Sequence, residues 1–320
     1  MTVMFVLWNT EMESLSLEPR ARSRDAEPLL HAPPRTLLLA TDLTARCDRA
    51  LERALMLAQG WQSRLVAVHA LEQSEETSRK VMDDPMSPAP RLKDMLHRAC
   101  LRLQQDILPM ADKGQAVAVP GKPIEAITQA AETFNCDFVV TGIGRDEMLT
   151  RLGLRRTMEK LVTRLGVPVL TVRGLVETPY KNILVAADLS DASRRALQAA
   201  ASLFPAQPLN VLHVYESPLP GGLAEGSREW EQYRQSAMRE MTNLVAGRRG
   251  AIAPSLNLLV RQGWPGEVIR QHVLNHDIDL VILGAHERGA LADLIFGSTA
   301  ADVLGTLPCD ILIVGRRETS

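Results

Sequence analysis

Short, continuous apolar runs alternate along the chain with longer segments in which apolar residues recur at helical spacing. Uninterrupted apolar runs are typical of strands that are buried on both faces of a parallel sheet. The amphipathic segments between them predict helices that cover those faces, and so an α/β fold. The predicted strands are Thr36–Thr41, Leu65–Leu71, Ala116–Val119, Asp137–Thr141, Pro168–Val172, Asn182–Ala187, Asn210–Tyr215, Leu256–Val260, Leu280–Gly284 and Asp310–Val314. Thr44 is expected to cap the helix that follows the first of these strands.

The same succession of elements occurs twice. The segment RTLLLATDLTARCDRAL, which opens at Arg35, returns as KNILVAADLSDASRRAL at Lys181, and GKPIEAI returns as GWPGEVI. Such self-similarity indicates two copies of one domain. We therefore expect a flexible tail over residues 1–34 with a short helix near its start, a first domain over 35–174 and a second over 181–316. Each domain is predicted to be a doubly wound, five-stranded parallel sheet.

The composition narrows the class of protein. The chain has 320 residues, 23% of them charged, and a formal net charge of -2, which argues against a general binder of nucleic acids or membrane surfaces. Its apolar runs are shorter than a bilayer crossing requires, and the start MTVMFVLW lacks the basic residues and cleavage site of a signal peptide. The 4 cysteines are scattered along the chain. We therefore expect a cytoplasmic protein.

One candidate site lies in the second copy, where predicted strands end. Asp188 follows the first strand of this copy and Gly284 ends its fourth, and ligands of such sheets bind beyond the carboxyl ends of strands where the strand order reverses. Gly297-Ser298-Thr299 opens a predicted helix, whose N–H groups and dipole favour a phosphate. Asp188 is a candidate acceptor for a ribose hydroxyl. The alternative is that Gly297-Ser298 is an ordinary helix start and Asp188 a capping residue.

Both copies resemble the universal stress protein family. The resemblance rests on ILVAADLS, GWPGEVI, DLVILGAHERG and GSTAADVLGTLPCDILIVG, and it covers about Arg35 to Gly315. It implies an adenine nucleotide alpha hydrolase-like fold with the strand order 3-2-1-4-5. It also implies that the last strands of the two copies, Pro168–Val172 and Asp310–Val314, pair as in the dimers of that family, so that the chain forms an internal pseudo-dimer.

Nucleotide-binding members of that family carry the pattern G-x2-G-x9-G-[ST]. Gly284 and Gly297-Ser298 match it, whereas Glu287 replaces the second glycine and would repel a polyphosphate unless Arg288 or a metal such as Mg²⁺ offsets its charge. The first copy has Arg155-Arg156 at the closing pair, so its site is expected to be degenerate. The resemblance thus implies these nucleotide-binding residues: Ala187, Asp188, Val214, Leu283, Gly284, His286, Glu287, Gly297, Ser298 and Thr299.

The leading hypothesis is a cytoplasmic stress-response protein that binds ATP or AMP in its second copy. A second hypothesis is a slow nucleotide hydrolase that activates water with His286 or Glu287. A third is a scaffold or a carrier of a lipid-like molecule, which would use the long predicted helix from Ser227 to Ala246 and its apolar residues. His272 and His276 are expected to share a helix face, although two histidines make a poor zinc site. The sequence leaves open whether two chains form a homodimer.

Overall fold

The computed structural model describes residues 6–7, 33–72, 88–107, 114–142, 151–176, 178–216, 222–224, 226–246, 255–288, 293–295 and 303–315. The chain folds into two compact units, with the main division between Arg145 and Asp146. The last helix and strand of the first repeat therefore belong to the second unit. Among the described helices, none combines the length and the apolar content that a bilayer crossing requires.

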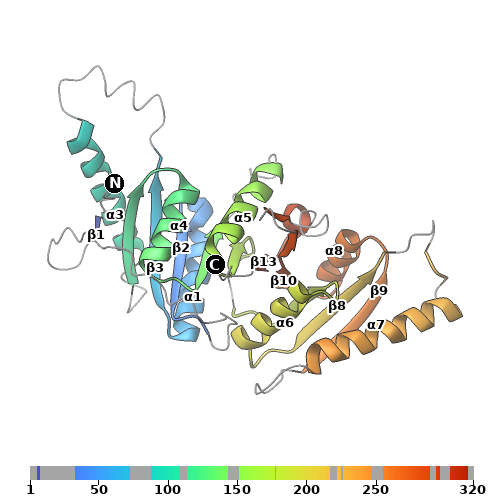
Figure 1. The fold of residues 1–320 in the computed structure, drawn as a ribbon. Coiled ribbons are helices and arrows are strands. Elements are labelled where there is room, and N and C mark those ends of the chain that lie inside the picture. Colours follow the sequence, from blue (N-terminus) through green and yellow to red (C-terminus); the bar gives the residue numbers. More distant parts are fainter. Residues whose placement is uncertain are drawn as a thin grey trace. The chain divides into compact units, whose positions relative to one another are not determined.

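The first unit is a mainly parallel sheet with helices against it (Figure 1). Its strand order is β1-β4-β3-β2-β5, in which β2 pairs in parallel with β3 and β5, and β3 with β4. The strands are β1 (Val6–Leu7), β2 (Thr36–Thr41), β3 (Arg64–Leu71), β4 (Gly114–Pro120) and β5 (Phe138–Gly142), and the helices are η1 (Ala45–Cys47), α1 (Asp48–Trp61), α3 (Pro88–Ile107) and α4 (Pro123–Thr133).

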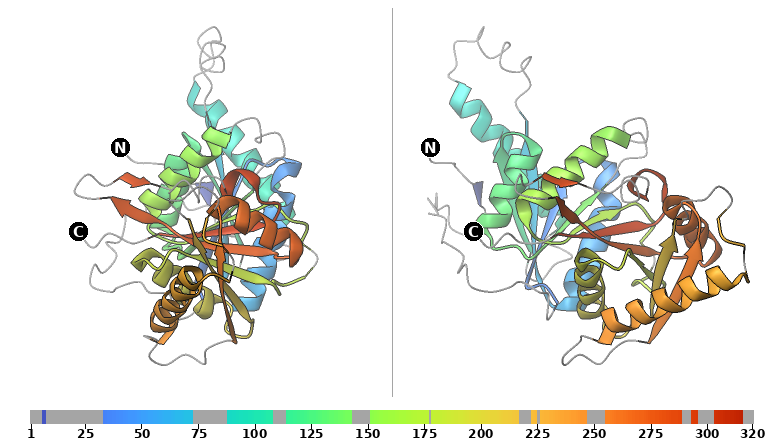
Figure 2. Two further views of the ribbon diagram at one scale, coloured as in Figure 1. Left: turned by 90° about the vertical axis from the view of Figure 1, so that its right-hand side faces the viewer. Right: turned by 45° about the vertical axis from the view of Figure 1, so that its right-hand side comes forward.

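The second unit contains the sheet order β6-β13-β10-β7-β8-β9. Its members β9-β8-β7-β10-β13 are all parallel, which confirms the predicted order 3-2-1-4-5 for the second repeat. The strands are β6 (Val169–Val172), β7 (Ile183–Ala187), β8 (Leu209–Tyr215), β9 (Leu256–Gln262), β10 (Leu280–Gly284) and β13 (Asp310–Val314), and the helices are α5 (Arg151–Leu165), α6 (Asp191–Leu203), α7 (Arg228–Ala246) and α8 (Pro265–Asn275). Figure 2 shows α7 running along β8 and β9.

The fifth strand of the first repeat, β6, lies in the second unit. It pairs antiparallel with β13, with Leu170 opposite Leu312 and Thr171 opposite Ile311. This is the strand pairing that the resemblance implied for the ends of the two repeats. It extends the sheet of the second unit by one strand beyond the five of the second repeat.

The apolar runs form the core, as the sequence pattern predicts. Leu37, Leu38 and Leu39 of β2 are buried, as are all the residues of β13. Strands that are buried on both faces need helices on both sides of the sheet. Helix α6 is one of these helices, and its buried face carries small residues such as Ala196. Burying one such leucine contributes about 2 kcal/mol, which explains why the runs are uninterrupted.

A buried carboxylate fixes the linker between the repeats. Asp310 is 1% exposed, and its Oδ1 accepts hydrogen bonds from the N–H groups of Arg173 (2.7 Å) and Gly174 (2.9 Å). Its Oδ2 accepts a hydrogen bond from the Tyr180 hydroxyl at 2.6 Å. The Arg173 Nη1 donates to the carbonyl of Leu307 at 2.7 Å, and burial lowers the pKa of this guanidinium. Both ends of the linker are therefore held at the start of β13.

Two local features differ from the predictions. Val6–Leu7 is a strand that pairs antiparallel with Ala118 and Val117 of β4, not a helix, because the open edge of β4 offers backbone partners. Thr44 does not directly precede α1, because the chain first passes through the single turn η1 and Cys47 is the N-cap residue of α1. The Thr44 hydroxyl donates to Asp42 Oδ1 at 2.7 Å.

Candidate functional site

The point where the strand order reverses lies between β7 and β10. Their parallel register places Val185 opposite Ile282, so that Ala187 and Gly284 end neighbouring strands at the same edge of the sheet. Asp188 follows directly, and Ala285 continues from β10 with its N–H bonded to the carbonyl of Val314 at 2.9 Å. The sequence prediction that strands one and four of this repeat are neighbours is confirmed.

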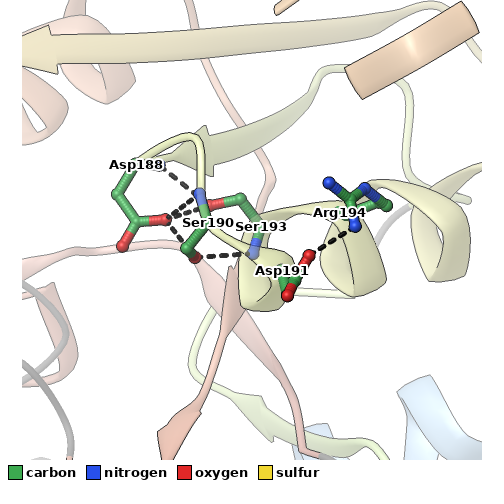
Figure 3. A network of polar contacts seen from close by, with 5 residues as sticks. All are labelled: Asp188, Ser190, Asp191, Ser193 and Arg194. Carbon is green, nitrogen blue, oxygen red and sulfur yellow. Dashed lines mark hydrogen bonds and ion pairs between the residues drawn. The ribbon is translucent and has the colours of Figure 1, made fainter. Parts of the chain in front are cut away.

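Asp188 is exposed and organises the start of α6 (Figure 3). Its Oδ1 accepts hydrogen bonds from the Ser190 N–H (3.1 Å), from the Ser190 hydroxyl (2.5 Å) and from the Ser193 hydroxyl. Ser190 is the N-cap of α6, and its Oγ accepts from the Ser193 N–H at 3.3 Å. Capping groups at a helix start stabilise it by about 1 kcal/mol each. The N-cap of α6 is therefore Ser190, and Asp188 positions this residue and Ser193 without being the cap itself.

Gly284 is required by the packing of α6 against β10. A Cβ atom built on it would overlap the backbone carbonyl of Ala192, which lies in the first turn of α6. From the sequence, this glycine was expected as the first glycine of the nucleotide-binding pattern. The structure gives a reason inside the protein, namely the close approach of helix and strand.

Arg195 is a cationic residue at this edge that the sequence analysis missed. It is half-buried on α6, and its Nη2 donates to the carbonyl of Ala285 at 3.2 Å. The guanidinium therefore lies where the chain leaves β10. Its position one helical turn after Ala192, which approaches β10, is the signal that could have indicated it.

The chain after β10 forms a pair of short strands that was not predicted from the sequence. β11 (His286–Arg288) pairs antiparallel with β12 (Asp293–Ile295), with Glu287 opposite Leu294. Helix α5 of the first repeat packs against β12, and Figure 2 shows this pair of strands beside α5. The backbones of His286 and Glu287 are thus placed in a short strand directly after the switch point.

The phosphate-binding turn predicted at Gly297, Ser298 and Thr299 lies outside the described residues. The following helical turn is described from Val303 to Thr306 and precedes β13. Two other predicted nucleotide-binding residues lie in described strands. Leu283 is buried in β10, and Val214 is half-buried in β8.

A histidine joins strands one and two in each repeat. His213 is 7% exposed, and its Nδ1 donates to the carbonyl of Ala187 at 2.9 Å, while its Nε2 accepts from the Tyr233 hydroxyl at 2.7 Å. In the first repeat the Nδ1 of His69 contacts the carbonyl of Thr41 at 3.0 Å in the same way. The shared contact supports a scaffold role for both histidines.

An aromatic cluster that was not predicted from the sequence lies beside His213 in the second repeat. The ring centroids of Tyr215 and Tyr233 are 3.9 Å apart, and those of Trp230 and Tyr233 are 6.1 Å apart and stacked. Burial, with smaller effects from Tyr215 and Glu240, raises the pKa of Tyr233. Trp230 and Tyr233 thus pack against the end of β8, which accounts for part of the apolar face of α7.

The first repeat preserves the turn after strand one, with a thiol in place of one of its hydroxyl groups. Asp42 Oδ1 accepts hydrogen bonds from the Thr44 N–H (2.9 Å) and the Thr44 hydroxyl (2.7 Å). Leu43 and Leu189 have the same left-handed backbone, with φ 61 and 67. Cys47 occupies the place of Ser193, and burial, with a smaller repulsion from Asp42, raises its pKa to about 11. A neutral thiol therefore stands where the second repeat has a hydroxyl.

The predicted histidine pair lies at the end of α8, with His272 in its last turn and His276 as its C-cap residue. The ring centroids of His272 and His276 are 4.3 Å apart, and burial, followed by the effects of His276 and Arg261, lowers the pKa of His272. Within the described ranges, His, Cys, Asp and Glu side chains form no group of three or more that could hold a metal ion.

Comparisons with known proteins match both repeats to one family model. The model of the Universal stress protein family matches residues 34–173 and residues 179–315. Among curated relatives, "Universal stress protein in QAH/OAS sulfhydrylase 3'region" of Thermus aquaticus is 33% identical over 137 residues, which are 42% of this chain and 98% of that protein. "Universal stress protein E homolog" of Haemophilus influenzae is 25% identical over 209 residues, 59% of this chain and 65% of that protein.

Among solved structures, a universal stress protein from Archaeoglobus fulgidus superposes with a TM-score of 0.64. Its sequence is 18% identical, and the match covers 91% of this chain and 100% of that chain. At this level of identity the likeness shows a shared fold. It extends over both repeats, which agrees with the repeated match to the family model.

Proposed function

Because the chain belongs to the universal stress protein family, we propose that it is a stress-response binding protein that holds an adenine nucleotide, ATP or AMP, in its second repeat. The observation that carries this proposal is the arrangement at the switch point, where Asp188 and Gly284 end neighbouring parallel strands. Ligands of doubly wound sheets bind beyond the carboxyl ends of such strands.

The spacing from Gly284 to Gly297-Ser298 supports a phosphate at the following helix start. In this proposal Asp188 accepts a ribose hydroxyl, while Val214 and Leu283 contact the base. Glu287 introduces a negative charge near the phosphates, and Arg195, Arg288 and a Mg²⁺ ion bound with ATP would offset it. The protein acts by binding in this proposal, so its function does not depend on turnover.

Isothermal titration of the full chain with ATP and with AMP tests the proposal. We expect saturable heat for at least one nucleotide in the presence of Mg²⁺, and we expect Gly297→Val to abolish it, because a branched side chain would block the approach of a phosphate. Folded protein that gives no heat at millimolar nucleotide would overturn the proposal. Phosphate release during the titration would instead favour the hydrolase hypothesis, in which His286 or Glu287 activates water.

A matched pair of variants locates the site. Asp188→Asn should weaken binding by about tenfold, since it removes a charged acceptor worth about 1.5 kcal/mol. Asp42→Asn makes the same change in the first repeat and should leave binding unchanged. Circular dichroism confirms that both variants remain folded. Equal losses in the two variants would contradict a site confined to the second repeat.

We also propose that the two repeats act as an internal pseudo-dimer through their last strands. The antiparallel register of β6 and β13 supports this arrangement. Hydrogen exchange of the full chain tests it, because amides of β6 should then be as protected as those of the central strand β10. Fast exchange throughout β6 would contradict it.

The proposed location is the cytoplasm. All four cysteines are buried thiols, and burial raises the pKa of Cys100 to about 11 and that of Cys309 to about 12. Cysteines remain free thiols in a reducing compartment such as the cytoplasm. Fractionation of cells that produce the full chain would test this, and recovery in the extracellular fraction would contradict it.

A further inference from the structure

The two repeats differ at the outer edge of their sheets. In the first unit, the edge strand β4 is covered by β1, which pairs Val6 with Ala118 and Leu7 with Val117. The equivalent strand of the second repeat is β9, and no described strand lies beyond it (Figure 1). An uncovered edge presents unpaired backbone groups to other chains.

The linker cannot cover β9 as the N-terminal segment covers β4. Tyr180 is held by Asp310, and the N–H of Lys181 donates to Asp279 Oδ2 at 2.7 Å. These contacts hold the linker at the amino ends of β13 and β7, and β7 is separated from β9 by β8. Among the described residues, the second repeat therefore lacks the covering strand that the first repeat has.

The backbone groups that face outward from β9 follow from its bonds to β8. The carbonyl of Ser255 accepts from Leu209, and the N–H of Gly263 donates to Tyr215. In a parallel pair, alternate residues bond to the same neighbour, so the intervening ones point to the open edge. The residues whose N–H and carbonyl groups face outward are Leu256, Leu258, Val260 and Gln262.

Most of the strand lacks the sequence features that usually block pairing at an edge, although the side chain of its last residue, Gln262, is hydrogen-bonded to the backbone of Leu223. Its sequence LNLLVRQ contains no proline, lysine or acidic residue, and Arg261 is its single charged residue. Leu258 and Leu259 are half-exposed, which is uncommon for a strand of this fold. Trp264, two residues beyond the strand, is 72% exposed.

We infer that β9 is the interface with a second copy of this chain, in which two β9 strands pair antiparallel about a two-fold axis at Leu259. This register places outward-facing groups opposite one another, with Leu258 of one copy facing Val260 of the other. It also places Asn257 opposite Arg261, in the pair of positions where side chains approach most closely.

Side chains on β9 complement one another in this register. Asn257 Nδ2 donates to Asn210 Oδ1 at 3.0 Å. The Asn257 side chain is exposed, and its Oδ1 can accept a hydrogen bond from a guanidinium group. Arg261 Nη1 now donates to the outward carbonyl of Val260 at 3.1 Å. On pairing, a backbone N–H of the second copy replaces it there, and Arg261 turns to Asn257.

Neighbouring registers satisfy these groups less well. An axis at Leu258 would set Arg261 opposite Ser255, and an axis at Val260 would set it opposite Leu259. The N-terminal strand of a second copy is a poorer occupant, because Val6–Leu7 already pairs with β4 of its own chain. A two-fold pairing of β9 also closes the assembly, because it leaves neither copy with an open β9 edge.

Sedimentation velocity of the full chain over a concentration series tests the inference. We expect a reversible monomer–dimer equilibrium. Asn257→Arg sets two guanidinium groups opposite each other twice in the dimer, and should raise the dissociation constant at least about tenfold. Adding Arg261→Glu to Asn257→Arg should restore association, because opposite charges then face each other. Gln59→Arg adds the same charge to the exposed face of α1 and should change nothing.

Hydrogen exchange provides a second readout. The amides of Leu256, Leu258 and Val260 should become protected as the concentration rises, while those of Asn257 and Leu259, which bond to β8, should be protected throughout. A chain that is monomeric at all concentrations would overturn the inference, and so would an Asn257→Arg variant that dimerises normally. A dimer that is lost on deletion of residues 1–8, but not on Asn257→Arg, would show exchange of the N-terminal strand and would overturn it too.

Discussion

The same turn follows the first strand in both repeats, but it is connected differently to the helix beyond it. In each, a carboxylate binds the hydroxyl residue two positions later across a leucine with positive φ. In the second repeat Ser193 extends this network into α6, whereas Cys47 in the first repeat contributes a buried thiol. A hydroxyl thus contacts the carboxylate of the turn in one repeat, and a buried thiol takes its place in the other, which shows how duplicated scaffolds diverge around a conserved backbone.

The largest expected effect concerns Asp310, whose place in the first repeat is taken by Pro168. Asp310→Ala removes the acceptor of two N–H groups and of the Tyr180 hydroxyl, and should lower the free energy of unfolding by about 3 kcal/mol. Urea unfolding followed by circular dichroism measures this. Pro168→Ala should cost less than about 1 kcal/mol, and a similar loss in both variants would mean that Asp310 has no special role.

A smaller loss is expected where α6 meets β10. Gly284→Ala forces a Cβ into the carbonyl of Ala192 and should destabilise the protein by about 2 kcal/mol. Gly60, in α1 of the first repeat, has open space around it, so Gly60→Ala should stabilise by about 0.5 kcal/mol. Thermal unfolding of the two variants checks the opposite signs. A neutral Gly284→Ala would mean that helix and strand can separate at low cost.

Exchanging the two residues that distinguish the turns should have an intermediate effect. Ser193→Cys weakens a hydrogen bond to the Asp188 carboxylate and should cost about 1 kcal/mol. Cys47→Ser should change stability by less than half as much, because Asp42 can accept the new hydroxyl. Labelling with a thiol reagent gives a further check, since the pKa of about 11 predicts that native Cys47 reacts slowly near neutral pH. Equal losses in the two variants would remove the distinction between the turns.

The smallest effect depends on pH and arises from His272, where the first repeat has Ala130. Burial lowers its pKa below 6.5, so the folded state binds the proton less readily than the unfolded state. Stability is therefore unaffected above pH 6.5 and falls as the pH drops from 6.5 toward the folded pKa. His272→Gln should abolish this loss, which urea unfolding at about pH 7.5 and about pH 5.5 would detect. A variant with the same pH dependence as the original protein would exclude His272 as its source.

The strands could be predicted from the sequence because their burial on both faces produces uninterrupted apolar runs. Thr36–Thr41, Leu280–Gly284 and Asp310–Val314 have the predicted bounds. The covering strand Val6–Leu7 and the hairpin β11–β12 were missed, since such short strands depend on partners distant in sequence or on a turn that carries no strong signal.

The candidate site was predicted in part. The pairing of β7 with β10 followed from the fold that the resemblance implied, and it brings Asp188 and Gly284 to one edge. The contact of Arg195 with Ala285 and the bond of His213 to Tyr233 were missed, because each joins elements whose separation in sequence does not indicate their distance in space. The reason for Gly284 was also missed, because the sequence does not show that the backbone of Ala192 fills the space beside this glycine.

The approach of Ala192 to Gly284 has a consequence for reading related sequences. Selection retains a glycine here for as long as the helix rests on the strand, whether or not the descendant still recognises a small molecule. Its retention in a homologue is therefore a poor diagnostic of activity, and lineages that have lost their ligand should be sought by changes elsewhere at the strand ends.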